Sequence, residues 1–140
     1  MSPSLNHSYY QSSANATLRN LKKYSIFTEL SLLIDTKEYV PDICVYAPMK
    51  INRSKDILRM TEMPLLAIEI ISPTQGSKEI LDKFEIYFAA HIKSCWLIDP
   101  ATGVVTVYAS LDKCRTFVEN DIIDTVLDLK IPIKDIFDDE

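Results

Sequence analysis

Residues 64–75 read PLLAIEIISPTQ, and this stretch decides how the rest of the chain is arranged. A short apolar run that is rich in isoleucine and stopped by Pro73 is typical of a buried strand, which we expect over 65–72. Glu69 lies in the middle of that run. Because a carboxylate among apolar groups costs several kcal/mol unless it is paired, the sequence predicts a partner for Glu69.

The segments around this strand predict a mixed α/β fold, with helices packed on a sheet. After the strand, apolar residues recur at helical spacing and indicate a helix that begins near Ser77 or Thr74 and runs to about His91. A helix between two strands in the middle of the chain indicates one crossover connection. The other expected elements are a helix over 8–22, strands over 24–34 and 39–46, a hairpin of 95–99 and 104–108, a short strand over 115–118 and a closing turn over 131–137.

Length and composition limit the class of protein. The chain has 140 residues, 47% of them hydrophobic, and a net charge of −5. We expect one domain over 1–140, in which 1–24 form an N-terminal arm and the first helix. No apolar run is long enough to cross a bilayer and no signal peptide is evident, so we expect no membrane contact and a cytoplasmic protein. Three scattered cysteines and two histidines lack the spacing of zinc ligands, and two glycines cannot form a glycine-rich phosphate loop.

Residues 50–62 concentrate positive charge in an acidic chain. One interpretation is a solvated loop, and the other is an edge of the protein that contacts phosphate groups. The negative net charge argues against a non-specific nucleic-acid coat protein, but it does not exclude a nuclease, because bound divalent metal offsets the carboxylates of such a site. The candidate phosphate contacts are Lys50, Arg53, Lys55 and Arg59.

Three charged residues, Asp42, Glu69 and Lys83, stand where a purely structural design would favour apolar groups. If the strand after Asp42 pairs with the strand of Glu69, the two carboxylates converge, and a divalent cation relieves their repulsion. Hard oxygen ligands suit Mg²⁺ or Mn²⁺, and the Lys83 ammonium completes a set suited to phosphodiester hydrolysis. Each residue also has a purely structural alternative. Asp42 could cap a turn, and Glu69 could form a buried ion pair. Lys83 could extend its ammonium past the edge of the helix into solvent.

Four motifs carry a resemblance to a known family: YVPDI at 39–43, EIISPT at 69–74, Lys83 with Tyr87 four residues later, and CWLIDP at 95–100. In this order and spacing they resemble the Uma-two family of restriction endonucleases, which belongs to the PD-(D/E)XK nuclease superfamily. The resemblance runs from about residue 25 to the C-terminus. His7 also looks like the family's histidine ahead of its first helix.

The resemblance implies a restriction-endonuclease-like core, in which a helix is followed by a mixed central sheet with a crossover helix and a C-terminal hairpin. It implies a metal-dependent site that hydrolyses DNA with Mg²⁺ or Mn²⁺. By motif position, the catalytic residues are Asp42, Glu69 and Lys83, and the metal ligands are Asp42, Glu69 and the main-chain carbonyl of Ile70. Tyr87 and Ser72 take supporting positions.

Some positions depart from the family pattern. Ile71 stands at the lysine position of the Glu-x-Lys element, and Lys83 looks like its migrated replacement. His91 and Ile92 replace a Gly-Val turn, and Cys95 stands where tyrosine is frequent. These departures leave open a catalytically inactive nuclease-fold module for binding or assembly, and a plain structural domain with a buried Glu69–Lys83 ion pair. As an enzyme, a domain of this size would cut both DNA strands most easily as a homodimer.

Overall fold

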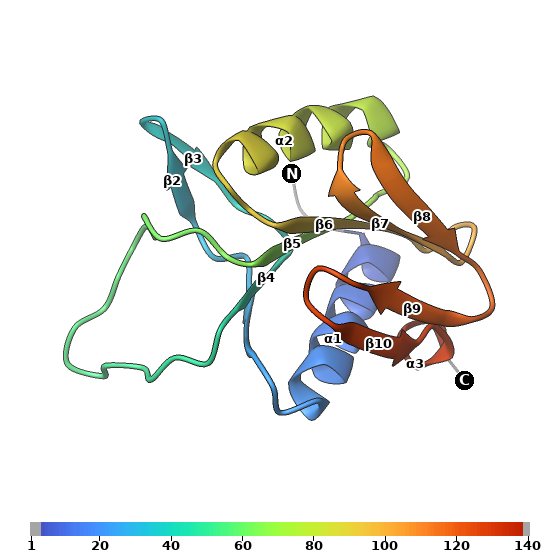
Figure 1. Ribbon diagram of the computed structural model, residues 1–140, viewed down its shortest axis with the longest axis horizontal. Helices are drawn as coiled ribbons and strands as arrows, with labels where there is room; N and C mark the ends of the chain where they lie inside the picture. The colour runs from blue at the N-terminus through green and yellow to red at the C-terminus, as the bar shows by residue number, and fades with distance from the viewer. Residues whose placement is uncertain (1–3, 139–140) are drawn as a thin grey trace.

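A six-stranded mixed sheet forms the centre of the protein in the computed structural model, which describes residues 4–138 (Figure 1). In sheet order its strands are β1 (Ser25–Thr28), β4 (Ile43–Tyr46), β5 (Leu66–Ile70), β6 (Ser94–Asp99), β7 (Val104–Ser110) and β8 (Lys113–Phe117). The remaining elements are α1 (Leu5–Asn20), the hairpin of β2 (Leu32–Ile34) and β3 (Lys37–Tyr39), α2 (Ser77–Ala89), the hairpin of β9 (Asp121–Asp124) and β10 (Leu129–Pro132), and α3 (Lys134–Phe137). The mixed α/β fold expected from the sequence is confirmed.

The middle of the sheet contains its parallel pair, β5 and β6, whereas the other neighbouring strands of this sheet are antiparallel. A parallel pair needs a long crossover connection, and α2 supplies it, as the sequence predicted. Figure 1 shows α2 on one face of the sheet, and α1 with the β9–β10 hairpin on the other. The fold therefore has three layers, with one apolar core on each side of the sheet.

The strand β5 is buried along its whole length, because both faces of the sheet are covered at this point. Ile68 belongs to the core beneath α1 and the β9–β10 hairpin. Ala67 belongs to the core beneath α2, together with Phe84 and Tyr87 of that helix. Glu69 alternates with Ile68 and so points to the α2 side. The apolar run that decided the fold is thus a central strand, as expected, shortened to residues 66–70 at its ends.

The first helix begins earlier than the sequence predicted. We expected it over 8–22, but α1 begins at Leu5, and the side chain of Ser4 caps it by accepting a 3.1 Å hydrogen bond from the His7 N–H. Serine is among the most favourable N-cap residues, and this cap adds one turn to the helix. His7, expected ahead of the first helix, therefore lies inside its first turn.

The two strands expected over 24–34 and 39–46 are each divided. Glu29 adopts a left-handed conformation with φ of 52°, and the bend separates β1 from the β2–β3 hairpin. Pro41 lacks an N–H group for a sheet ladder, and β4 begins only at Ile43. Asp35 and Thr36, which both have positive φ, form the tight connection of the β2–β3 hairpin.

The C-terminal third confirms one hairpin and adds another. The expected strands over 95–99 and 104–108 are β6 and β7, which pair antiparallel, and the expected short strand over 115–118 is β8, which begins at Lys113. The β9–β10 hairpin was not predicted. The expected closing turn contains the short helix α3, whose Ile136 is fully buried in the core against α1.

Candidate active site

Asp42 and Glu69 meet at one end of the two central strands β4 and β5. These strands are antiparallel, and Ile43 is the register partner of Ile68. The same register, continued by one residue, sets Asp42 opposite Glu69, and residues opposite each other in an antiparallel pair point to the same face. The Ile70 N–H donates a 2.7 Å hydrogen bond to Oδ2 of Asp42, which fixes the Asp42 carboxylate against the end of β5.

Both carboxylates line a cavity of about 550 Å³ near the N-terminal ends of α1 and α2. Lys83 lines it from α2, and Ser72 lines it from the connection between β5 and α2. Two more carboxylates, those of Glu29 and Glu79, belong to the same wall. The cavity is therefore acidic, with one lysine among four carboxylates, and it opens at the end of the sheet where β5 finishes.

Glu69 is almost sealed in protein, with 3% of its surface exposed. Its Oε2 accepts a 2.9 Å hydrogen bond from the Tyr87 hydroxyl, and its Oε1 lies 3.9 Å from Nζ of Lys83. Burial is the main reason that the pKa of Glu69 is raised to about 8. The neighbouring Asp42 carboxylate acts in the same direction, and Lys83 and the Tyr87 hydroxyl oppose the shift. A negative charge on Glu69 is therefore only partly compensated by the protein, which favours a cation in the cavity.

Asp42 is held by two elements of the fold, β5 and α1. Its Oδ2 accepts the Ile70 N–H bond from β5 and lies 3.1 Å from Nε2 of His7 in α1. Its main-chain carbonyl accepts a 2.9 Å hydrogen bond from the Gln11 amide, one turn further along α1. Burial raises the pKa of Asp42 above its ordinary value, although the Ile70 hydrogen bond and the nearby His7 and Lys83 oppose this shift.

Lys83 lies at the wall of the cavity and forms only a long, partly exposed ion pair with Glu69. Its side chain is 33% exposed, and its 3.9 Å separation from Glu69 is too long for a hydrogen bond. The purely structural alternative, a buried ion pair between Glu69 and Lys83, predicts a tight and enclosed contact. The observed geometry leaves the ammonium free to approach a ligand of the cavity.

Asp42 and Glu69 offer the hard oxygen ligands that Mg²⁺ and Mn²⁺ prefer. Within residues 4–138, no three His, Cys, Asp or Glu side chains are grouped closely enough to hold a metal ion by themselves. Mg²⁺ commonly binds through one or two carboxylates and keeps several water ligands, so a two-carboxylate site fits this ion. The same pair would be a poor zinc site, since zinc favours four protein ligands that include Cys or His.

The sequence profile of a family described as "Putative restriction endonuclease" matches residues 1–130. The chain belongs to this family, Uma2. The resemblance stated from four motifs is thereby confirmed, and the match begins at residue 1, ahead of the expected start near residue 25. None of the curated proteins matches the chain.

A solved structure gives the same assignment for the fold of this Uma2 chain. The crystal structure of a "putative nuclease belonging to DUF820" from Anabaena variabilis ATCC 29413 is similar with a TM-score of 0.77 and 26% sequence identity. The similarity covers 99% of this chain and 83% of that chain. Family and fold together support a nuclease function. None of the helices in the described part of the Uma2 chain has the length and apolarity to cross a membrane.

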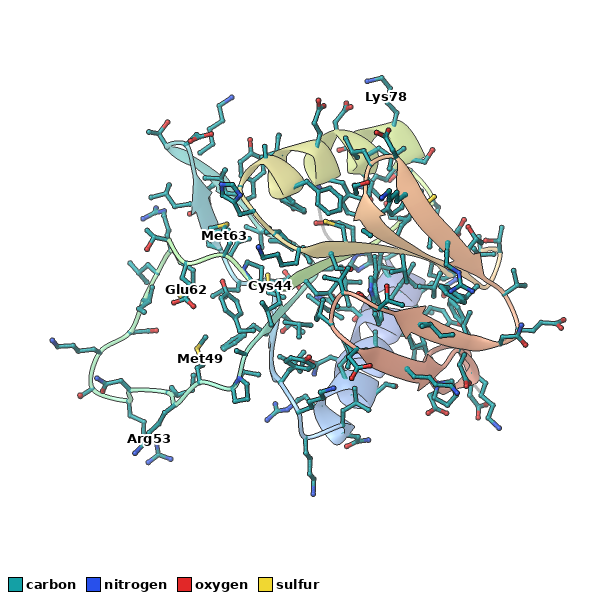
Figure 2. All side chains as sticks on the ribbon, viewed as in Figure 1. Cys44, Met49, Arg53, Glu62, Met63 and Lys78 are labelled. Atoms are coloured by element: carbon teal, nitrogen blue, oxygen red, sulfur yellow. The ribbon has the colours of Figure 1, made fainter. Side chains whose placement is uncertain are left out.

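The basic segment of the Uma2 chain lies away from the cavity. It belongs to the loop 47–65, which leaves β4 after Tyr46 and enters β5 at Leu66, at the opposite end of these strands from Asp42. Figure 1 shows this loop extending away from the sheet, and in Figure 2 Arg53 points outward from it. Arg59 forms a 2.6 Å ion pair with Glu38 of β3. The structure thus brings Asp42, Glu69, Lys83, Ser72 and Tyr87 together, but it does not bring the basic segment to them.

Sequence reasoning missed two carboxylates of the cavity, Glu29 and Glu79, and the contact from Gln11. Glu29 accepts a 3.2 Å hydrogen bond from the Gln11 amide, which also bonds the main chain of Asp42. The signal for Glu29 was the same as for Glu69: an acidic residue inside a run of strand-forming residues. No comparable signal marks Glu79, because an acidic residue in the first turn of a helix is ordinary.

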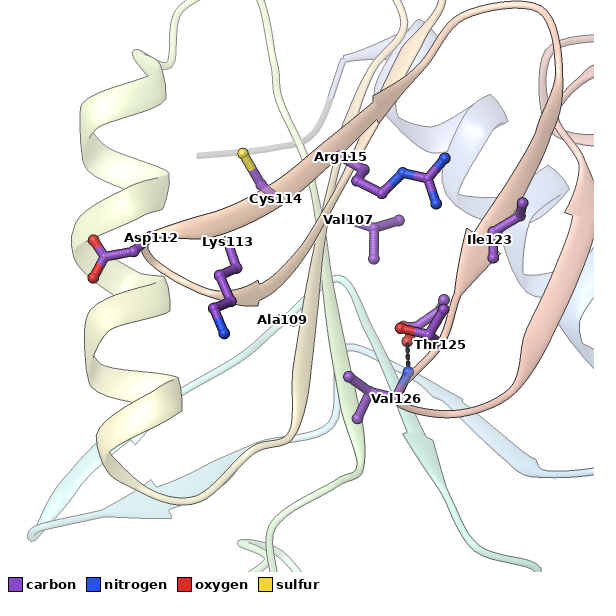
Figure 3. A pocket seen from close by; sticks show the side chains of 10 residues that line it. Val107, Ala109, Asp112, Lys113, Cys114, Arg115, Ile123, Thr125 and Val126 are labelled. Atoms are coloured by element: carbon purple, nitrogen blue, oxygen red, sulfur yellow. Dashed lines mark hydrogen bonds between the residues drawn. The ribbon is translucent and has the colours of Figure 1, made fainter.

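A second cavity, of about 350 Å³, lies between β7, β8 and the turn after β9 (Figure 3). Lys113 and Arg115 point in different directions there, and the exposed Cys114 lies between them in sequence. The dashed line in Figure 3 joins the Val126 N–H to a carboxylate oxygen of Asp124, a 2.9 Å bond within the turn. Polar groups of the lining do not converge on one point, so the acidic cavity is the better candidate for chemistry.

Proposed function

We propose that this Uma2 chain is a divalent-metal-dependent endonuclease that hydrolyses the phosphodiester bonds of DNA. The observation that carries the proposal is the juxtaposition of Asp42 and Glu69 in an acidic cavity, with Lys83 at its wall. Two carboxylates whose pKa values are both raised indicate a site where negative charge is in excess. A bound divalent cation would offset that excess.

The proposed ligands are the carboxylates of Asp42 and Glu69 and the main-chain carbonyl of Ile70, for Mg²⁺ or Mn²⁺. The N–H of Ile70 points toward Asp42, whereas the N–H of the next residue, Ile71, bonds Ile98 on the other side of β5. Because the N–H and C=O of one strand residue point to the same side, the Ile70 carbonyl is directed toward Asp42. This supports its inclusion, with water completing the coordination.

The metal, when bound, polarises the phosphate and lowers the pKa of a bound water. Lys83 is proposed to orient the nucleophile or to neutralise charge that develops on the phosphate, because its ammonium reaches the cavity wall without being sealed in an ion pair. Tyr87 supports the site by fixing Oε2 of Glu69. Ser72 is proposed as a supporting residue because it lines the cavity directly after β5.

DNA is the proposed substrate, and the cytoplasm the proposed location. Lys50, Arg53 and Lys55 are exposed on the loop 47–65 and are proposed to contact phosphates of a duplex at a distance from the cavity. Arg59 is a weaker candidate, because Glu38 already pairs with it. We also propose a homodimer, since a protein of this size covers little DNA and two copies would allow both strands to be cut.

The separation of the basic loop from the acidic cavity favours a second candidate function. A catalytically inactive nuclease-fold module would bind nucleic acid through the loop, or assemble with a partner, without cleaving anything. In that case Asp42 and Glu69 would be needed only for the fold. The two candidates differ in whether cleavage depends on metal and on these two carboxylates.

The test is cleavage of supercoiled plasmid with Mg²⁺ or Mn²⁺, compared with EDTA. Asp42→Ala and Glu69→Ala should each lower the rate by at least about 100-fold, because loss of a metal ligand removes several kcal/mol of transition-state stabilisation. The Lys83→Ala variant should also cleave the plasmid slowly. Its matched control is Lys78→Ala, on the same helix, since Lys78 is 88% exposed and points away from the protein (Figure 2). Cleavage that survives EDTA, or that survives both carboxylate substitutions, would contradict the proposal.

A further inference from the structure

We propose that His7 is a positioning residue, which holds Oδ2 of Asp42 so that the Oδ1 oxygen is presented to a cation. This inference rests on the proposed metal site, because the orientation of Asp42 matters only if its carboxylate binds a ligand. It assigns a role to helix α1, which supplies no group of the proposed catalytic set.

The first support is that one oxygen of Asp42 is occupied from two directions. The Ile70 N–H reaches Oδ2 from β5 at 2.7 Å, and Nε2 of His7 reaches the same oxygen from α1 at 3.1 Å. No hydrogen bond from residues 4–138 goes to Oδ1, although the Asp42 side chain lines the cavity. The χ2 torsion of an aspartate is otherwise broad, so two donors on Oδ2 restrict the carboxylate to one plane.

The second support is that the contact is built into the fold. The side chains of His7 and Asp42 are only 10% and 16% exposed. His7 lies in the first turn of α1, where its own N–H is held by the Ser4 cap. Gln11, four residues later and on the same face of the helix, bonds the main-chain carbonyl of Asp42. One face of α1 therefore holds both the backbone and the side chain of the carboxylate residue.

The third support comes from the other ring nitrogen of His7. Nδ1 is buried and has no hydrogen-bond partner among the described residues. A ring that carries its hydrogen on Nε2 donates to the carboxylate and leaves only a lone pair at Nδ1. A hydrogen on Nδ1 would be a buried donor without an acceptor, which costs about 1–3 kcal/mol. The Nε2–H tautomer therefore fits both nitrogens, and the ring acts as a donor that orients Asp42.

Partners that orient a metal ligand commonly matter almost as much as the ligand itself. Their removal typically lowers metal affinity by about 10- to 100-fold. His7 would act in this way, since its ring lines the cavity and bonds the Asp42 carboxylate, while Asp42 and Glu69 supply the proposed carboxylate ligands. A purely structural histidine would affect the stability of the protein and leave the affinity of the folded protein for metal unchanged.

Two substitutions of similar polarity separate these roles. His7→Gln keeps an N–H donor at nearly the reach of Nε2, whereas His7→Asn carries its amide one bond shorter and cannot reach Oδ2. We expect Mn²⁺ affinity, measured by calorimetry on the metal-free protein, to fall about 10- to 100-fold in His7→Asn and to stay close to the wild type in His7→Gln. His91→Asn is the control for loss of the only other histidine, which is exposed.

The ring nitrogens give a readout without metal. The ¹⁵N signals of His7 are identified by their persistence in His91→Asn, and we expect the pattern of the Nε2–H tautomer. The opposite tautomer, or equal Mn²⁺ affinity in His7→Asn and the wild type, would overturn the inference and leave the proposed function standing. If the wild type itself binds no Mn²⁺, the proposed metal site fails together with the inference.

Discussion

Tyr87 donates its hydroxyl hydrogen to Oε2 of Glu69 at 2.9 Å, and this bond joins helix α2 to the central strand β5. Lys83 lies one turn earlier on the same face of α2 and approaches the other oxygen, Oε1, at 3.9 Å. The helix thus touches both oxygens of one buried carboxylate, tightly through the tyrosine and loosely through the lysine. This difference assigns a holding role to Tyr87 and leaves Lys83 available to a ligand.

Tyr87→Phe removes the tight contact and keeps the ring. We expect the free energy of unfolding to fall by about 1–3 kcal/mol, because the buried Glu69 carboxylate loses the hydrogen bond from this hydroxyl. Urea denaturation of the metal-free protein measures this change. Tyr9→Phe is the control, since Tyr9 is 47% exposed and its substitution should have almost no effect. Equal stability of Tyr87→Phe and the wild type would show that the hydrogen bond contributes nothing.

The stability of the metal-free protein should depend on pH through Glu69. Burial raises the pKa of this carboxyl from its ordinary 4.5 to about 8 in the folded state. Between these values the folded protein holds a proton that the unfolded chain has released, so the free energy of unfolding falls as the pH rises from about 4.5 to about 8. The stabilisation is complete below that window and is lost above it. Asp42, whose pKa is also raised, contributes with the same sign.

Thermal unfolding in EDTA from about pH 5.5 to about pH 8.5 measures this dependence, and the melting temperature should fall across the range. Glu69→Gln has no titrating carboxyl and should show a flatter profile. Mg²⁺ should raise the melting temperature of the wild type more at the alkaline end than at the acidic end, because the cation binds the ionised carboxylate. A wild-type profile as flat as that of Glu69→Gln would contradict the assigned environment of this residue.

Asp124 should be a structural residue of large effect. Its buried Oδ2 accepts hydrogen bonds from Ser94 at 2.6 Å and from the Trp96 indole at 2.8 Å, and its Oδ1 accepts two backbone N–H groups of the turn after β9. In Asp124→Asn, an NH₂ group replaces one of the two accepting oxygens and faces hydrogen-bond donors that it cannot accept from. We therefore expect the free energy of unfolding to fall by about 3 kcal/mol. Asp121→Asn, in the same hairpin, removes an exposed 3.6 Å ion pair and should cost less than about 1 kcal/mol.

The parts of the fold that the sequence predicted are those with a strong local pattern. A short stretch of sequence is enough to recognise each of three elements: the apolar run of β5, the helical spacing in α2 and the turn between β6 and β7. The convergence of Asp42 with Glu69 was also predictable, because it follows from the pairing of two recognisable strands. Their roles in metal binding stay predictions.

The parts that the sequence did not predict depend on distant contacts or on unusual backbone. Glu29 takes a left-handed conformation although no glycine or asparagine marks the bend. The β9–β10 hairpin is anchored through Asp124 to Trp96, 28 residues away, and no local pattern records such a contact. The basic segment follows Asp42 closely in sequence, yet β4 carries the chain to the other end of the sheet before it begins.

His91 occupies a position that favours glycine. It follows the last turn of α2 with φ of 75°, and the N–H groups of His91 and Ile92 bond the carbonyls of Phe88 and Tyr87. This is the usual glycine position at the end of a helix. We expect His91→Gly to raise the free energy of unfolding by about 1 kcal/mol, because the left-handed conformation costs a β-carbon residue about that much. Gly103→Ala, at φ of 68°, should have the opposite sign in the same urea titration.

The loop 47–65 offers a direct test of the proposed DNA contacts. We expect the triple substitution of Lys50, Arg53 and Lys55 by alanine to weaken binding to a short duplex. The slope of log affinity against log salt should fall by about 0.9 for each phosphate group that the protein no longer neutralises, which distinguishes direct phosphate binding from a general effect of net charge. The control is a triple substitution of exposed lysines elsewhere, Lys22, Lys78 and Lys113. Fluorescence anisotropy at several salt concentrations measures both proteins, in Ca²⁺ so that binding is observed apart from cleavage. If the two triple variants show equal slopes, the loop is a solvated segment and the duplex is bound elsewhere.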